Sequence, residues 1–197
     1  MLRAHELPPP GHGGNTDFAD TRTAFDELPS DLKAQLLEND YIGANSLWHS
    51  RKKACPESEL LKHIDPEKYP FGRHRIVQRH ERSGRTNLYI ANHLHHLEYA
   101  DTDAEGRHAR RRVPEPESTA LIDTLLAHAT QDKYVLSVEW REPGDLVCWD
   151  NTAVMHRAGP GSFMGRFKRD MRRTTVHDAS PTAWGLNERT TERMGLP

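Results

Sequence analysis

Proline and glycine divide most of this chain into segments too short for long helices. Residues 8–14 read PPPGHGG and exclude regular structure, because proline lacks an amide donor and glycine relaxes the backbone. Apolar runs of strand length recur between such turns, at residues 74–80, 86–91, 134–140 and 145–149. The pattern favours a β-sandwich or barrel with helices packed outside the sheets.

Helical periodicity occurs at three places. A helix is expected to follow a cap at residues 20–21 and to reach Leu28, and a second is expected over residues 32–39. The clearest pattern covers residues 118–131, where apolar side chains recur every three or four positions. Residues 50–70 are charged and interrupted by proline, which indicates a surface excursion, with one helical turn expected at residues 57–64.

The remaining segments complete one domain. Residues 2–7, 45–49 and 171–177 are further expected strands, and a glycine-containing turn should join the two runs around residue 83 into a hairpin. A chain of 197 residues suits one sizeable domain, which we expect to span residues 1–180. Residues 181–197 are expected to form a tail.

The charge balance and the cysteines narrow the class of protein. Acidic and basic residues nearly cancel, at 29 against 27, so no overall field favours nucleic acid or a membrane as partner. Two isolated cysteines and the lack of a long apolar run predict a cytoplasmic protein. A small-molecule substrate is the expected partner, and association with a second copy stays open.

Residues 143–176 hold the strongest chemical signal. An apolar strand ends in a turn at Asn151, and His156 lies where the next strand resumes. A rigid strand suits a metal ligand, because the imidazole ring must be held and its second nitrogen oriented. For His156 alone, a metal-binding role and a packing role are equally supported.

Two arginines and a threonine are candidates for binding an anion. Arg169 and Arg173 share a face of an extended segment, and either guanidinium could bind a carboxylate through two parallel hydrogen bonds. The alternative for this pair is a salt-bridged surface strand. Thr16 follows a Gly-Gly turn and could donate its hydroxyl to the same anion, although such a turn is also needed to enter the next segment.

Three neighbouring histidines suggest a second metal cluster. In a regular strand His93 and His95 share a face while His96 points away, so at most two imidazoles could converge. Exposed histidine is common in proteins, which favours a polar strand end with solvated imidazoles.

Taken in order, these segments resemble the Fe(II)- and 2-oxoglutarate-dependent dioxygenases of the taurine dioxygenase/TfdA family. The similarity covers about residues 2–178. It rests on GGNTDFA near the start, GRTNLYIANH in the middle, and the specific pair WDNxxxxHRA and RRTTV near the end. The resemblance implies a mainly β fold with packed helices, a cupin-like double-stranded β-helix or jelly-roll that is incomplete at the N-terminus.

The resemblance also implies cofactors and site residues. The family holds Fe(II) with an HxD…H facial triad and leaves positions open for 2-oxoglutarate and oxygen. By resemblance, His156 matches the distal histidine of the triad. Thr16 and Arg169 match residues that bind 2-oxoglutarate, and Arg173 matches an arginine that holds the cosubstrate or the substrate. His93 matches a histidine near the substrate pocket, and this is the weakest of the transfers.

One departure from the family qualifies the expected function. The family places HxD further upstream of the GGNT turn than this chain extends, and no HxD fills that place here. We therefore expect a truncated oxygenase with reduced or absent activity, derived from an enzyme that hydroxylates, desaturates or cleaves a small organic acid or secondary metabolite. The alternative is a non-catalytic β-sandwich protein that associates with a partner or a full-length paralogue.

Overall fold

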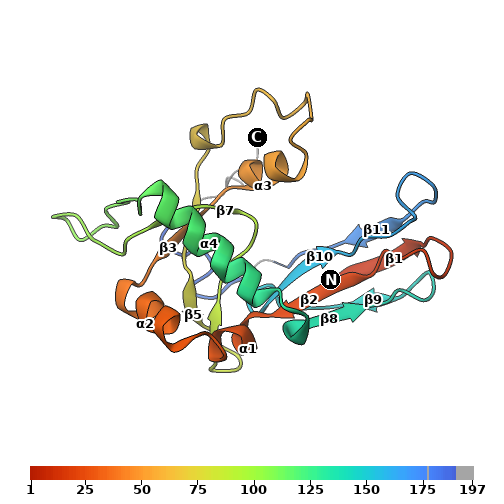
Figure 1. The fold of residues 1–197 in the computed structure, drawn as a ribbon, viewed down its shortest axis with the longest axis horizontal. Coiled ribbons are helices and arrows are strands. Elements are labelled where there is room, and N and C mark those ends of the chain that lie inside the picture. Colours follow the sequence, from red (N-terminus) through yellow and green to blue (C-terminus); the bar gives the residue numbers. More distant parts are fainter. Residues whose placement is uncertain (177, 190–197) are drawn as a thin grey trace.

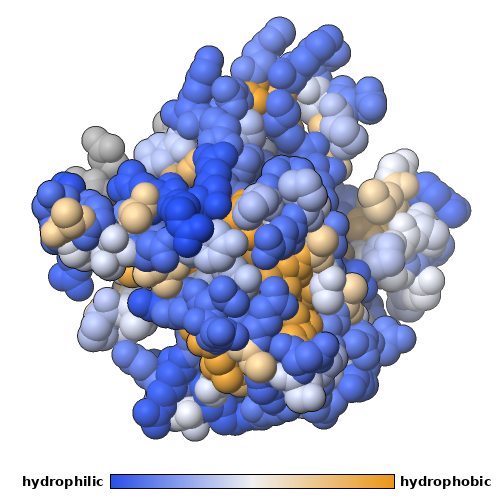
Figure 2. Space-filling model, turned by 60° about the vertical axis from the view of Figure 1, so that its left-hand side comes forward, coloured by the Kyte–Doolittle hydropathy of each residue, from blue (hydrophilic) through white to orange (hydrophobic). Residues whose placement is uncertain are grey.

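The computed structural model describes residues 1–176 and 178–189, which form a mainly β structure with helices packed on one side. Figure 1 shows α1, α2 and α4 gathered together, while β1, β2 and the strands that pair with them extend away. Within the described residues, no helix is both long and apolar enough to cross a membrane. Figure 2 shows a largely hydrophilic face on which apolar atoms gather in a central strip.

Two three-stranded antiparallel sheets combine strands from the N-terminal and C-terminal parts of the chain. In the first, β1 lies between β11 and β9; in the second, β2 lies between β10 and β8. Their bounds are β1 Leu2–Glu6, β2 Thr16–Asp20, β8 Val135–Val138, β9 Leu146–Val147, β10 Val154–Ala158 and β11 Asp170–Arg173. The strands expected near residues 134–140, 145–149 and 171–177 are therefore present but shorter, and His177 lies outside the described residues.

Two smaller antiparallel sheets form the rest. One has the order β4-β3-β7, and the other is the β5-β6 hairpin. Their bounds are β3 Ile42–Asn45, β4 Gly72–Arg75, β5 Val77–Arg79, β6 Thr86–Leu88 and β7 Leu94–Glu98. The expected hairpin is confirmed, and Gly84 in its turn has a φ of +67°. The run 74–80 serves two sheets because it breaks at Ile76, which is fully buried.

Side chains cap the starts of α1 and α3, whereas proline precedes α2 and α4. Asp20 accepts a hydrogen bond from the Arg22 amide at the start of α1, as the sequence predicts. The helices are α1 Thr21–Asp26, α2 Ser30–Asn39, α3 Leu47–Ala54 and α4 Glu115–Ala129, with the 3₁₀ turns η1 Pro66–Lys68 and η2 Asp132–Tyr134.

The expected strand at residues 45–49 is wrong. The Ser46 hydroxyl accepts from the His49 amide and caps α3, so only Asn45 belongs to a strand. Likewise, residues 57–64 form turns rather than a helix. At residues 46–49 the capping side chain outweighs the local β preference.

The core lies between α4 and the β4-β3-β7 sheet. Leu125 of α4 and Leu97 of β7 are fully buried, and the Ser118 hydroxyl accepts from the Leu97 amide at 2.8 Å. The described part of the expected tail also contacts this sheet, because the Arg73 amide donates to Asn187 Oδ1 at 2.6 Å. The sheet is thus covered by α4 and held at its β4 edge.

Replacing Gly43 by alanine should lower the free energy of unfolding by about 1–3 kcal/mol. A Cβ at this position in β3 would run into the Leu94 Cδ2 methyl and lie 3.1 Å from Ile76 Cγ2. Urea denaturation measures the change. The control Gly72→Ala, where the nearest atom would be Asn45 Cβ at 3.9 Å, should be close to neutral. Equal stability of the two variants would contradict the tight packing at Gly43.

Candidate functional site

Strand β2 places the two ends of the expected site on one face. In the β2–β10 pair, His156 lies opposite Phe18 and Ala158 lies opposite Thr16. Residues directly opposite in antiparallel strands point to the same side, and side chains two apart along a strand share a face. His156 and Thr16 therefore project from the same side of this sheet.

Aromatic rings surround His156. Its ring centroid lies 4.8 Å from that of Trp149 and 6.3 Å from that of Phe18. Burial, and next the positive charge of Arg173, hold the pKa of His156 below its ordinary value. The imidazole is thus neutral at pH 7, which is the form that binds a metal ion.

Thr16, Trp140 and Arg169 form a polar cluster at the start of β2. Trp140 Nε1 donates to Thr16 Oγ1 at 3.0 Å, and Arg169 Nη2 lies 3.5 Å from the same oxygen. Arg169 Nε donates to the Gly14 carbonyl at 2.9 Å. Gly14 has a φ of +89°, and a Cβ there would lie 3.2 Å from Arg169 Cδ and Nε, so the turn needs glycine at this position.

The arginines of this segment differ in their partners. Arg172 pairs with Asp170 at 2.9 Å, which makes this part a salt-bridged strand. By contrast, no carboxylate of the described residues lies within 4.0 Å of a nitrogen of Arg169 or Arg173. Arg169 is half-buried, and burial lowers its pKa. A half-buried guanidinium without a carboxylate partner suits a bound anion.

A large open cavity lies beside His156. Its volume is about 920 Å³, and His156, Arg173 and His93 are among the residues that line it. His93 is exposed, and its Nδ1 lies 2.7 Å from Ser50 Oγ. Thr16 and Arg169 do not line this cavity. The structure thus groups the five candidate residues into three that line the cavity and a separate pair, Thr16 on β2 and Arg169 in the segment before β11.

Asn87 also lines this cavity, although it was not among the site residues expected from the sequence. Asn87 Nδ2 donates to the Thr152 carbonyl at 2.7 Å, while its buried Oδ1 has no partner among the described residues. An unpaired buried acceptor is costly, so it can accept a hydrogen bond from a ligand in the cavity. Asn87 is the first asparagine of the GRTNLYIANH segment, but an asparagine in a strand does not by itself indicate a ligand contact.

The described residues fit an anion better than a complete iron site. No group of three potential metal ligands among them includes His156. The sequence has one His-x-Asp triplet, His63 to Asp65, but it lies in the excursion before η1, where Asp65 accepts from the Glu67 amide. One imidazole is too few for a stable ferrous site, which needs several ligands at fixed geometry.

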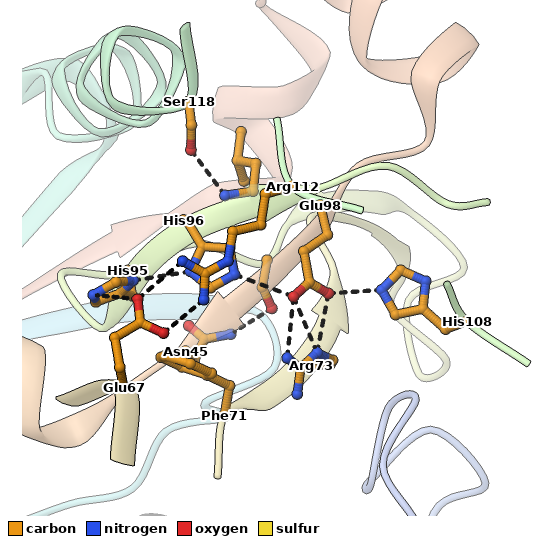
Figure 3. Close-up of polar contacts among 12 residues, drawn as sticks. Asn45, Glu67, Phe71, Arg73, His95, His96, Glu98, His108, Arg112 and Ser118 are labelled. Carbon is orange, nitrogen blue, oxygen red and sulfur yellow. Dashed lines mark hydrogen bonds and ion pairs between the residues drawn. The ribbon is translucent and has the colours of Figure 1, made fainter. Parts of the chain in front are cut away.

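The expectation of solvated imidazoles at His95 and His96 is wrong. His96 is buried, and the Nδ1 atoms of the two rings lie 2.9 Å apart (Figure 3). The cause is a β-bulge: Ala44 pairs with His96 and Asn45 with Leu94, so His95 is an extra residue in β7. A bulge interrupts the alternation of side chains that the sequence argument assumed.

Comparisons with known proteins give a consistent result. The family model "Taurine catabolism dioxygenase TauD, TfdA family" matches residues 1–175. An alpha-ketoglutarate-dependent 2,4-dichlorophenoxyacetate dioxygenase from Burkholderia sp. is 36% identical over 178 residues, which are 89% of this chain and 52% of that protein. Pentalenolactone F synthase from Streptomyces avermitilis is 28% identical, over 79% of this chain and 49% of the relative. The chain spans about half the length of these curated relatives.

Two solved structures are similar to this chain in fold. The crystal structure of AAD-2 in complex with Mn(II) and N-oxalylglycine has a TM-score of 0.70 and 33% identity, over 92% of this chain and 63% of that one. A 2,4-D dioxygenase structure from Burkholderia xenovorans has a TM-score of 0.68 and 32% identity, over 87% of this chain and 58% of that one. These similarities confirm the expected jelly-roll fold.

In metal-free protein, His156 should titrate below the ordinary histidine pKa of about 6.5. A depressed histidine pKa means that the unfolded chain binds more protons, so stability should fall as the pH drops below about 6.5. Replacing Arg173 by glutamine should raise the pKa of His156, because it removes a nearby positive charge. Histidine NMR in EDTA measures both, and Arg172→Gln is the matched control. An unchanged His156 pKa in the Arg173 variant would contradict this electrostatic effect of Arg173.

Proposed function

The chain belongs to the taurine catabolism dioxygenase TauD/TfdA family, and we propose that it serves Fe(II)- and 2-oxoglutarate-dependent oxidation of a small organic acid. The observation that carries the proposal is the half-buried Arg169, which has no carboxylate partner among the described residues and lies beside the Thr16 hydroxyl. The cosubstrate, when bound with the metal, supplies electrons for the reduction of oxygen through its own decarboxylation.

Hydrogen-bond accounting supports Arg169 and Thr16 as the anion-binding pair. The Trp140 indole nitrogen can only donate, and it donates to Thr16 Oγ1 at 3.0 Å. Arg169 also can only donate, so neither neighbour accepts the Thr16 proton. The hydroxyl is therefore free to donate to a carboxylate that the Arg169 guanidinium binds. Burial of Thr16, which is 2% exposed, keeps competing water away.

The cavity supports an acidic substrate with an apolar body. Arg173 supplies a positive charge, and Leu47 and Ile90 supply apolar surface on the opposite elements α3 and the segment after β6. Asn87 Oδ1 offers an acceptor for a hydroxyl or amide of the substrate. We propose that Arg173 binds the acidic group and that His93, at the cavity edge, contacts the substrate. The name of the relative from Burkholderia sp. includes such an acid, 2,4-dichlorophenoxyacetate.

Among the described residues, His156 is the one candidate ligand of the proposed iron site. Its neutral ring is held among Trp149 and Phe18, and it lies at the wall of the substrate cavity. The donor set around it is incomplete for iron, so we propose that the chain by itself has low or no oxygenase activity. A non-catalytic role in association with another protein is the competing proposal.

Binding of 2-oxoglutarate should weaken by about 10- to 100-fold in Arg169→Lys, which corresponds to one charge-assisted hydrogen bond of about 1.5–3 kcal/mol. Lysine keeps the charge but lacks the two parallel donors. Isothermal titration calorimetry on metal-free protein measures the affinity. Arg172→Lys is the control, because Arg172 pairs with Asp170. Equal affinity of the wild type and the Arg169 variant, or no binding by the wild type, would favour the non-catalytic alternative.

Succinate formation by the chain with Fe(II), 2-oxoglutarate and oxygen should stay near the background rate. The reason is that His156 has no second and third ligand among the described residues. Mass spectrometry of succinate over time measures it, with a heat-denatured sample as the control. Many turnovers per chain, lost in His156→Ala, would show that the site is more complete than the donor set suggests.

A further inference from the structure

We propose that Glu67, His95 and His96 form a binding site for a divalent transition metal ion such as Zn²⁺, separate from the cavity at His156. Each residue offers one ligand atom, and the three atoms lie within 4.8 Å of one another. Figure 3 shows the two rings and the Glu67 carboxylate pointing toward one another from β7 and η1. The proposal does not depend on the oxygenase function.

The β7 bulge makes this convergence possible. Because His95 is the extra residue of the bulge, its ring reaches the same side as that of His96. The His95 ring is then packed between Phe71 and His49, whose centroids lie 5.2 Å and 4.9 Å from it. A ring held by its neighbours loses little freedom when it binds an ion, which favours binding.

A buried carboxylate orients His96 as in known metal sites. His96 Nε2 donates to Glu98 Oε1 at 3.1 Å, and Glu98 is 1% exposed. Glu98 also accepts from Arg73 Nε at 3.0 Å and from His108 Nε2 at 2.7 Å, so it stays ionised. Donation from Nε2 places the free lone pair of neutral His96 on Nδ1, which faces His95. Metal-binding histidines commonly have such a carboxylate behind them.

Hydrogen bonds alone leave the cluster unsatisfied when both rings are neutral. His96 Nδ1 is an acceptor, so His95 must direct its single N–H from Nδ1 across the 2.9 Å contact. The other nitrogen of His95, Nε2, then turns a lone pair toward Glu67 Oε1 at 3.7 Å, where two acceptors face each other. A cation among these atoms removes the conflict.

The Glu67 carboxylate can bind a metal despite its ion pair with Arg112. Arg112 donates to both oxygens of the carboxylate, at 2.9 Å and 2.6 Å. A carboxylate has about four lone-pair sites, so two remain for an ion. The positive charge of Arg112 opposes a cation, and we therefore expect weaker binding than at structural zinc sites with four protein ligands.

The ligand types indicate the kind of metal. Two imidazoles and one carboxylate suit Zn²⁺ and its neighbours in the first transition row, whereas Mg²⁺ and Ca²⁺ prefer oxygen ligands alone. Ligand atoms about 2 Å from a tetrahedral ion lie about 3.3 Å from each other. The site reaches that spacing by rotation of Glu67, whose side chain is 42% exposed. A water molecule would be the fourth ligand.

A metal at this site would hold η1 against β7. Glu67 belongs to the excursion between α3 and β4, whereas both histidines belong to the sheet. Pro70, three residues after Glu67, and Asn45 at the end of β3 both line the large cavity. Zinc binding should therefore order the excursion beside the cavity entrance.

Titration of the metal-free chain with ZnCl₂ tests the proposal, with calorimetry for affinity and the visible spectrum of a Co²⁺ substitute for ligand geometry. We expect one ion per chain, tetrahedral Co²⁺ bands, and a weakening of at least about tenfold in His95→Ala and in Glu67→Gln. Glu67 is a surface residue, so its variant should fold even if the His95 variant does not, and circular dichroism checks both.

Two controls separate this site from other histidines. His63→Ala, an exposed histidine of the same excursion, and His156→Ala should both keep the wild-type affinity for Zn²⁺. In hydrogen exchange, Zn²⁺ should slow the backbone amides of Asp65 and residues 67–69 in the wild type and not in Glu67→Gln. The proposal is overturned if the wild type binds no Zn²⁺, if Glu67→Gln binds as tightly as the wild type, or if His156→Ala removes the ion.

Discussion

The pairing of β2 with both of its neighbours is the constraint on which the candidate site depends. Its hydrogen bonds to β10 set His156 opposite Phe18, and its hydrogen bonds to β8 bring Trp140, two residues beyond that strand, to Thr16. A shift of one residue in either register would turn these side chains to the other face. The site therefore depends on the pairing of β2 with two strands, β8 and β10, that follow it by more than 100 residues.

Close backbone packing completes this arrangement at the Gly-Gly turn. Arg169 lies against Gly14 and donates to its carbonyl, in the space that a side chain would otherwise fill. The same turn leads directly into Thr16, so the hydroxyl and the guanidinium are positioned by one short segment. A cation held this way, half-buried and without a carboxylate partner among the described residues, keeps its capacity to bind an anion.

A single extra residue in β7 creates the second polar centre of the structure. The bulge at His95 turns two adjacent imidazoles toward Glu67, and the buried Glu98 holds one of them from behind (Figure 3). This centre lies in the β4-β3-β7 sheet, whereas the His156 site is built on β2 and β10. The β4-β3-β7 sheet reaches the cavity at His156 through Asn45 of β3, whereas Glu67, His95 and His96 do not line it.

Features that depend on neighbouring residues could be predicted from the sequence. Four such features were predicted: the cap at Asp20, the periodicity of α4, the β5–β6 hairpin, and the family motifs around His156 and Arg169. Each depends on residues a few positions apart, where backbone preference and side-chain period decide the outcome. Even so, Ser46 shows the limit, because its capping hydroxyl converted an expected strand into the start of α3.

Contacts between side chains far apart in the sequence could not be predicted and became visible in the fold. In the fold, Trp140 donates to Thr16, and Asn87 lies in the cavity wall. Arg172 pairs with Asp170, whereas Arg169 and Arg173 have no carboxylate partner among the described residues. His95 and His96 also converge in the fold, against the strict alternation of a strand. Register and bulges are set by the partner strand and by packing, and the sequence of a single strand contains neither.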